Sequence, residues 1–162
     1  MLTTVKNIIR RTRQHHAIEH ATLHVLAARF SHRRMAGYSD PGGFTIFCDL
    51  PLESVRRGVS DALLQLQSGQ ADLAIHPNCG TNLAVTALLA TTAAVVGGGR
   101  SRDPLTRFAG GLALVMPALV VAQPLGLRVQ RYTTLATVND CWIKDMRPVS
   151  GGFVQAVRVE FA

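Results

Sequence analysis

The amino-acid sequence predicts an α+β membrane protein, and three observations lead to that fold class. A histidine-rich helix and a short strand come first, two uncharged apolar stretches follow at 83–99 and 108–127, and the chain ends in alternating apolar and polar residues. We therefore expect an N-terminal αβ region over 1–80, a transmembrane helical hairpin over 83–127, and a C-terminal β region over 128–162 that completes the N-terminal domain.

Composition and charge narrow the class of partner. Hydrophobic residues make up 48% of the 162 residues and charged residues only 17%, which is apolar for a soluble protein of this size. The net charge is +7, but aromatic residues are few and the arginines are scattered. We therefore expect the acidic partner to be a lipid bilayer and not nucleic acid. The three cysteines form no C-x-x-C pair, which indicates a reducing compartment and no disulfide framework.

Residues 3–30 are predicted to form a helix with a bend or an interruption near 10–14. The later part of this helix is apolar over more than half of its circumference, so we expect it to be half-buried. The earlier part is basic and suits a start that faces lipid headgroups, although a solvated face would have the same composition. The basic residues are Lys6, Arg10, Arg11 and Arg13.

The helix carries the most informative pattern in the chain, His16-Ala-Ile-Glu19-His20. His16 and His20 lie one turn apart on one face, and Glu19 projects about 60° to one side of His16. The order H-x-x-E-H is the inverted form of a zinc signature in which two histidines hold the metal and the glutamate acts as general base. His15 and His24 crowd the same segment. A solvated surface helix is the alternative interpretation of such a pattern.

A second polar cluster, His76-Pro-Asn-Cys79, lies farther along the chain. Two imidazoles from a helix and one thiolate from a distant loop make a reasonable zinc set, with a fourth position left for water. We therefore expect His16, His20 and Cys79 to be the metal ligands. Residues 71–75 are predicted to be a short extended run that leads into His76-Pro77, where proline disfavours helix for the residue before it.

The elements between these clusters are predicted from their turn residues and periodicity. Residues 29–43 are rich in turn formers and are expected to be a loop. Residues 44–48 have the composition of a strand, in which Cys48 is a small buried hydrophobe and not a ligand. Residues 51–67 are predicted to form an amphipathic helix that a Ser-Gly pair stops.

The two apolar stretches match the length of about 20 residues that crosses a bilayer as helix. A buried helical hairpin inside a soluble protein is the alternative. Small residues recur in both stretches, so we expect close packing between them or with other protomers, and hence a homo-oligomer. Pro117 and Pro124 are expected to kink or end the second helix.

The C-terminal region and the hairpin loop bear on topology. Residues 153–161 alternate apolar and polar side chains after a Ser-Gly-Gly turn, which predicts a β-hairpin that forms a sheet with strand 44–48. With two spans, both polar regions must lie on one side of the membrane, and the arginine-containing loop 100–107 on the other. The first ten residues lack the apolar run of a signal peptide, which favours polar regions in the cytoplasm over the opposite orientation suggested by the loop arginines.

Three separated motifs occur in order along residues 14–138. They are His16-x-x-Glu19-His20, His76-Pro-x-Cys79-Gly-Thr before the first apolar stretch, and Gly126-Leu-Arg-Val-Gln130-Arg-x-Thr-Thr at the end of the second. In that order they resemble the YqhQ-like family, uncharacterised bacterial membrane proteins described as predicted metal-dependent enzymes. The resemblance implies a metal site in the bacterial inner membrane and supplies no reaction. Ala21, Asn78 and Asn82 depart from the residues of that family.

Three functions fit these observations. In the first, a membrane-bound hydrolase of peptides or lipids binds zinc through His16, His20 and Cys79, with Glu19 as general base and His76 orienting a ligand or stabilising the transition state. In the second, a non-catalytic membrane subunit or scaffold closes the same metal site with His76 as fourth ligand. In the third, a histidine of the helix binds haem or another cofactor.

Overall fold

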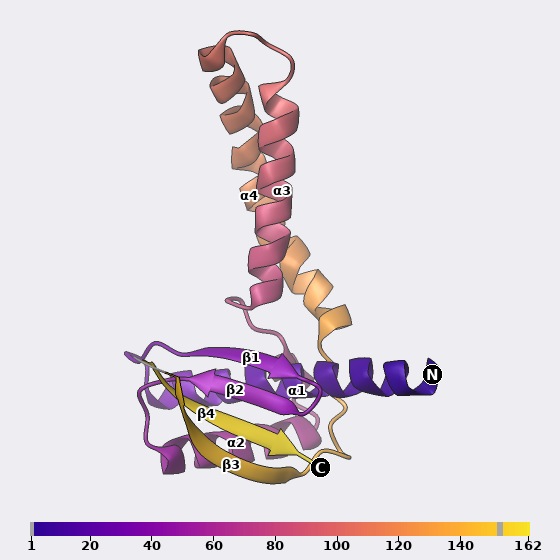
Figure 1. The fold of residues 1–162 in the computed structure, drawn as a ribbon, viewed down its shortest axis with the longest axis vertical. Helices are drawn as coiled ribbons and strands as arrows, with labels where there is room; N and C mark the ends of the chain where they lie inside the picture. Colours follow the sequence, from indigo (N-terminus) through magenta and orange to yellow (C-terminus); the bar gives the residue numbers. More distant parts are fainter. Residues whose placement is uncertain (1, 152–153) are drawn as a thin grey trace. The chain divides into compact units, whose positions relative to one another are not determined.

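The computed structural model describes residues 2–151 and 154–162, which fall into two compact units. The first unit combines Met1–His76 with Thr133–Ala162, and the second unit is Pro77–Tyr132. The described elements are four α-helices, one short 3₁₀ helix and one four-stranded antiparallel sheet, so the predicted α+β class is confirmed (Figure 1). The chain leaves the first unit once and returns to it once.

Helix α1 (Leu2–Arg29) is the central element of the first unit. Every residue from 14 to 26 is buried or half-buried, so the helix is enclosed around its whole circumference there. The predicted interruption near 10–14 is wrong, because this segment has no Gly or Pro to break the helix. The segment that follows the second unit also holds α1, because the N–H of Leu135 donates a hydrogen bond to the carbonyl of Arg13 at 2.9 Å.

The sheet is built from two hairpins that lie far apart in the sequence. Strands β1 (Ala36–Asp40) and β2 (Gly43–Phe47) form one, and β3 (Ile143–Gly151) and β4 (Val154–Phe161) form the other. The strand order is β1-β2-β4-β3, with every neighbouring pair antiparallel. The predicted pairing of the C-terminal hairpin with strand 44–48 is therefore confirmed. Residues 152–153 of the predicted turn lie outside the described residues.

Strand β1 was not expected, since 29–43 was predicted to be a loop. Its sequence Ala-Gly-Tyr-Ser-Asp lacks the alternation of large apolar residues that marks a strand. It forms because a tight turn at Pro41-Gly42 folds it back along the whole of β2, with Ala36 opposite Phe47. The N–H of Gly42 donates to the carboxylate of Asp40 at 2.8 Å in that turn.

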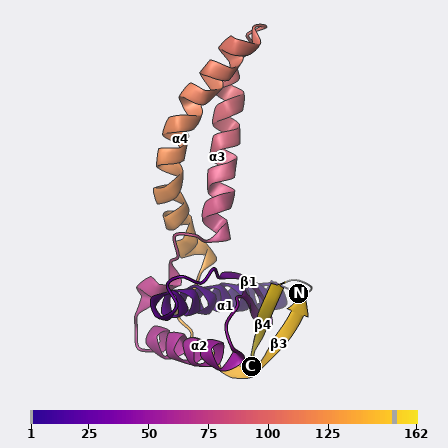
Figure 2. The same ribbon diagram turned by 90° about the vertical axis from the view of Figure 1, so that its left-hand side faces the viewer.

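Helices α1 and α2 (Leu52–Gln67) pack against one face of the sheet, and the hydrophobic core lies between these helices and the strands (Figures 1 and 2). Alternate residues of each central strand point into this core, as the two-residue period of a strand requires. The fully buried apolar side chains include Ile18, Leu26, Phe44, Ile46, Val55, Val59 and Val159. This core fixes α1 against the strands and so fixes the direction of its polar side chains.

The segment after α2 corrects another expectation. Residues 71–75 were predicted to be extended, but Ala71–Ala74 form one 3₁₀ turn, η1, and only Ile75 has extended backbone angles. Backbone bonds close the turn, with Leu73 N–H donating to Gln70 at 3.2 Å and Ile75 N–H donating to Asp72 at 3.1 Å. The prediction failed because a run of five residues is too short to show a helical or strand period.

The second unit contains α3 (Gly80–Gly98) and most of α4 (Pro104–Thr133), both long and apolar enough to cross a membrane. A core helix of a soluble protein would bury its large apolar side chains, whereas these helices expose theirs, including Leu88, Val95, Phe108 and Val120. The helix α4 continues through Pro117 and Pro124, so the second proline does not end it, and it is curved in Figure 2.

Two glycines bring α3 and α4 into backbone contact. A Cβ atom on Gly97 would lie 2.2 Å from the carbonyl oxygen of Gly110, and the reverse distance is also 2.2 Å. Near the other end of the pair, the amide of Gln130 donates to the buried Asn82 at 2.9 Å. Close approach of small residues and one buried polar contact are typical of helix pairs in membranes.

Candidate metal centre

Helix α1 places His16 and His20 one turn apart with their rings in contact. The ring centroids are 4.3 Å apart and the rings meet edge to face. His20 is 1% exposed and His16 is half-buried. Two imidazoles in this arrangement can chelate a single ion, which is the arrangement predicted from the H-x-x-E-H spacing.

The hydrogen bonds of His20 leave one ring nitrogen available. Its Nδ1 lies 2.7 Å from the carbonyl oxygen of Ala74. A carbonyl can only accept, so Nδ1 carries the proton and Nε2 has the lone pair. Within the described part of the chain, this buried Nε2 has no hydrogen-bond partner. A buried nitrogen that lacks a partner is costly, and a carbonyl on the other nitrogen is the usual support of a metal-binding histidine.

His16 is oriented by the segment that returns to the first unit. Its Nδ1 lies 3.2 Å from the carbonyl oxygen of Thr133, which again makes Nε2 the nitrogen with the lone pair. The same tautomer therefore follows for both histidines of the pair. Both supporting carbonyls belong to the backbone, so no side-chain pattern in the sequence could have indicated them.

His76 lies beside the pair and is held in its neutral form. Its ring centroid is 5.7 Å from that of His20 and 4.7 Å from that of His24. Burial, with smaller contributions from His24 and His20, lowers the pKa of His76 to about 4. Near neutral pH this imidazole is therefore uncharged, and it can accept a hydrogen bond or bind a metal ion. The Nε2 of His24 forms a hydrogen bond with the carbonyl oxygen of Ile75 at 2.8 Å. The carbonyls of Ala74 and Ile75, at the end of η1, therefore each orient one histidine.

Glu19 points toward β1 and is almost completely buried. It is 4% exposed, and burial raises its pKa, with an opposing contribution from a hydrogen bond donated by Ser39. Gly37 lies against the same side chain: a Cβ atom there would come within 2.3 Å of the Glu19 carboxylate. Glu19 is therefore closely packed against β1, and the hydrogen bond from Ser39 helps to hold its carboxylate in position.

Ser39 and Gly37 were not predicted to belong to the site. Both belong to β1, which was expected to be a loop. The signal that could have found them is the two-residue spacing of Gly37 and Ser39 in an extended segment, because it puts both on the face toward the core. Their contribution is to position Glu19, not to bind an ion.

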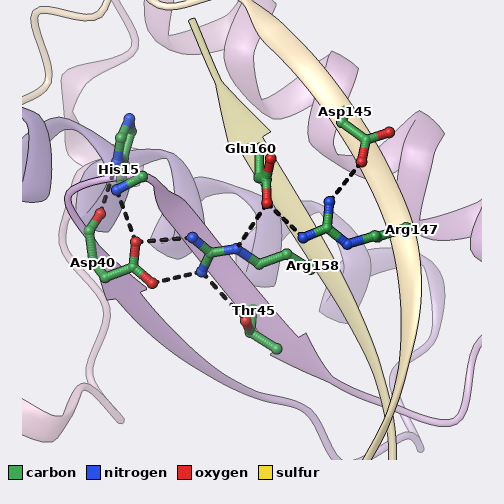
Figure 3. A network of polar contacts seen from close by, with 8 residues as sticks. His15, Asp40, Thr45, Asp145, Arg147, Arg158 and Glu160 are labelled. Atoms are coloured by element: carbon green, nitrogen blue, oxygen red, sulfur yellow. Dashed lines mark hydrogen bonds and ion pairs between the residues drawn. The ribbon is translucent and has the colours of Figure 1, made fainter.

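His15 belongs to a different network from the other histidines. Its Nδ1 lies 2.9 Å from the carbonyl oxygen of Asp40 (Figure 3). Its ring stacks on that of Phe161, with the ring centroids 4.9 Å apart. The carboxylate of Asp40 receives two hydrogen bonds from Arg158, at 2.6 and 2.8 Å. This guanidinium lowers the pKa of Asp40, and burial lowers the pKa of His15. The crowding of histidines in the sequence therefore overstates the number available to one site.

Cys79 lies at the start of the second unit, at the N-cap position of α3. It is buried, and its sulfur accepts a hydrogen bond from the N–H of Thr81 at 3.4 Å. It follows His76 by three residues, and three extended residues span at most roughly 10 Å, so the backbone itself limits the distance between the two. His16, His20 and Cys79 together offer three ligand atoms that could hold one metal ion.

Comparison with known proteins assigns a family. Residues 11–146 match the model of a domain of unknown function, DUF6391. The chain belongs to this family. The match includes α1 from residue 11 onward, β1, β2, all of α2, α3 and α4, and the start of β3. The family description assigns no activity, and the resemblance to YqhQ-like proteins stays a prediction.

An uncharacterised protein of the cyanobacterium Picosynechococcus sp. is also similar. It is 38% identical over 136 residues, which cover 76% of this chain and 65% of that protein. The DUF6391 chain thus spans slightly under two thirds of the length of the curated relative that it matches. No solved structure matches the chain.

Proposed function

We propose that this DUF6391 protein is a membrane-embedded metal-binding protein, in which His16, His20 and Cys79 hold one divalent cation. The observation that carries the proposal is the Nε2 atom of His20, which is buried, deprotonated and without a hydrogen-bond partner among the described residues. Its supporting carbonyl fixes both the tautomer and the direction of the lone pair. A bound cation would satisfy this nitrogen.

Zinc is the cation that fits this set of donors best. Two imidazoles and one thiolate are borderline to soft ligands, and zinc accepts both types in a tetrahedral site. Magnesium and calcium prefer oxygen ligands, and the three proposed ligands supply none. Zinc bound by three protein ligands polarises a carbonyl or phosphoryl oxygen and makes a bound water more acidic.

We further propose a hydrolase that acts on a peptide or a lipid near the bilayer. Glu19 would accept the proton of the attacking water, and the raised pKa of this carboxyl suits a general base that works near neutral pH. His76 is neutral and would orient a ligand or donate to the developing charge. The resemblance to YqhQ-like proteins, which implies a metal-dependent enzyme, supports this version.

A non-catalytic scaffold with a closed metal site is the second candidate. The position of His76 favours it, because its ring lies 5.7 Å from that of His20 and could supply a fourth ligand. Four protein ligands are typical of structural zinc sites, whereas catalytic sites keep one position for water. The number of protein ligands therefore separates the two candidates.

We also propose that the helices α3 and α4 span the bacterial inner membrane, with the first unit in the cytoplasm and with self-association through the helices. The exposed apolar side chains of both helices support a lipid environment. Cys48 and Cys141 are buried free thiols, which fits a reducing compartment. Accessibility of the loop 100–107 and of the exposed residues 31–34 of the first unit to a membrane-impermeant reagent in sealed vesicles tests the orientation: labelling of both from one side contradicts it.

Metal analysis of the purified protein tests the proposed ligands. We expect about one zinc per chain, lost in His20→Ala and Cys79→Ala, because two remaining ligands chelate weakly. His32→Ala changes an exposed histidine and is the matched control, which should keep the metal. A wild-type protein that binds no divalent metal, or a His20→Ala variant that binds it as well as the control, contradicts the proposal.

The variant Glu19→Gln tests the role of the carboxylate. It preserves the shape of the side chain, so we expect it to keep the metal and to lose hydrolytic activity. X-ray absorption on the wild type and His76→Ala then counts the ligands. Three protein ligands in both favour the hydrolase, and loss of one nitrogen ligand in His76→Ala favours the scaffold. If Glu19→Gln loses zinc as completely as His20→Ala, Glu19 is a ligand and the general-base role is wrong.

A further inference from the structure

The first turns of α1 form an exposed helical segment, which we name the N-terminal arm and define as residues 3–11. Every residue of the arm is exposed, whereas every residue of α1 from 14 to 26 is buried or half-buried. The arm nevertheless carries large aliphatic side chains, and Val5, Ile8 and Ile9 are 52%, 46% and 53% exposed. An exposed run of this kind in a basic helix calls for a partner surface.

The aliphatic side chains of the arm lie on one face. At 100° per residue, Val5, Ile8 and Ile9 fall within an arc of about 100°. Lys6 lies about 60° beyond one edge of this arc, and Arg11 lies about 60° beyond the other. The basic side chains therefore flank the apolar face on both sides, which is the arrangement found in helices that lie in a membrane interface.

The charge of the arm has a single sign. The sequence contains no acidic residue before Glu19, so no acidic residue within the arm balances its positive charges. Arg10 is engaged with Asp140 of the first unit at 2.9 Å. Lys6 and Arg11 are both exposed, and they border the apolar face. A surface that fits the arm must be negatively charged and must accept aliphatic side chains just below its charged layer.

From this geometry we propose that the N-terminal arm docks in the interface of an anionic lipid bilayer. The apolar face enters the acyl boundary, and Lys6 and Arg11 contact headgroup phosphates. An acidic protein would satisfy the charges, but a bilayer is favoured because α3 and α4 are themselves long and apolar enough to enter one. The inference does not depend on the metal site, and it would stand if the protein bound no metal.

Tryptophan fluorescence in vesicles tests the docking. The full chain has one tryptophan, the exposed Trp142, so Trp142→Phe gives a silent background. Val5→Trp and Ile9→Trp report from the apolar face, and Asn7→Trp reports from the opposite face of the same arm as the matched control. Each variant is reconstituted in vesicles of phosphatidylcholine alone or with phosphatidylglycerol, with and without brominated acyl chains as quencher.

We expect Trp at positions 5 and 9 to be quenched and blue-shifted in the anionic vesicles, and Trp at position 7 to remain in water. Lys6→Gln and Arg11→Gln should each reduce the ratio of docked to undocked arm by about fivefold, as one lost charge at an anionic surface implies. Absence of quenching at positions 5 and 9 overturns the proposal. A blue shift at positions 5 and 9 that is the same in both kinds of vesicle, and that occurs without quenching, also overturns the proposal. It would indicate that the arm contacts a protein partner or a second copy of the chain.

Discussion

The hydroxyl of Ser39 on β1 donates a hydrogen bond to the buried carboxylate of Glu19 on α1. This bond connects the edge of the sheet to the histidine helix, and it opposes the effect of burial on the pKa of Glu19. The carboxylate of the H-x-x-E-H pattern is therefore positioned by a residue outside the pattern. Two substitutions in β1 follow from this relationship.

Ser39→Ala should weaken the fold and raise the pKa of Glu19 further. The variant removes a bond to a carboxylate that is 4% exposed, and such losses cost about 1–3 kcal/mol of unfolding free energy. Denaturant unfolding measures the first effect, and a carboxyl-resolved NMR titration measures the second. Ser31→Ala alters an exposed serine and serves as control. An unchanged Glu19 titration in Ser39→Ala would show that the bond is not made in solution.

Gly37→Ala should displace Glu19. The new Cβ would lie 2.3 Å from the carboxylate, and insertion of a methyl group in a packed site costs about 1–3 kcal/mol. The control is a double-mutant cycle, since Glu19→Ala removes the obstructing side chain. In the Glu19→Ala background, the added Gly37→Ala substitution should cost much less unfolding free energy. Equal costs in the two backgrounds would show that Gly37 does not pack against Glu19.

The pair of Asp40 and Arg158 should make the first unit sensitive to acid. Arg158 holds the pKa of Asp40 below its ordinary value of 3.8. A carboxyl whose folded pKa is lowered stabilises the fold above its unfolded pKa, and this contribution is lost as the pH falls through the folded pKa. Asp40→Asn should therefore flatten the loss of stability below about pH 4. Thermal unfolding across pH 2–6 measures this, and Asp49→Asn, in an exposed pair, should keep the wild-type slope.

Neighbouring glycines in α3 should differ sharply in their tolerance of alanine. Gly97→Ala would put a methyl group 2.2 Å from the backbone of α4, which cannot move without separating the helices. Gly98→Ala meets only the carbonyl of Arg107, at an ordinary 3.5 Å. Both changes raise helix propensity alike, so the difference isolates the contact. We expect Gly97→Ala to lose about 1–3 kcal/mol in detergent unfolding and Gly98→Ala to lose none. Equal behaviour would contradict the close pairing.

Helical periodicity was sufficient to bring His16 and His20 side by side, because one turn of helix fixes their separation without help from the rest of the fold. The supports of these side chains could not be predicted in the same way. The carbonyls of Ala74 and Thr133 are backbone groups and carry no sequence signature. Their positions depend on where the chain turns in η1 and where it leaves α4.

The apolar stretches and the C-terminal hairpin were predictable because their signals are long. Strand β1 was not, since it contains Gly, Ser and Asp and gains its stability from pairing with β2 and not from its own composition. The continuation of α4 past Pro124 was also not predictable. Proline removes one hydrogen bond, and whether the helix absorbs this loss depends on its surroundings and not on the proline alone.

The order of strands constrains how the chain can be made. Strand β2 pairs with β1 on one edge and with β4 on the other, so Phe44 cannot pair with Val159 until the chain has been synthesised past α3 and α4. During that interval α3 and α4 are synthesised, while β2 presents an unpaired edge of the kind that attracts other strands. Both apolar helices are therefore synthesised before the sheet can form completely, and a pause in synthesis before β4 would leave the edge of β2 open to pairing with other chains.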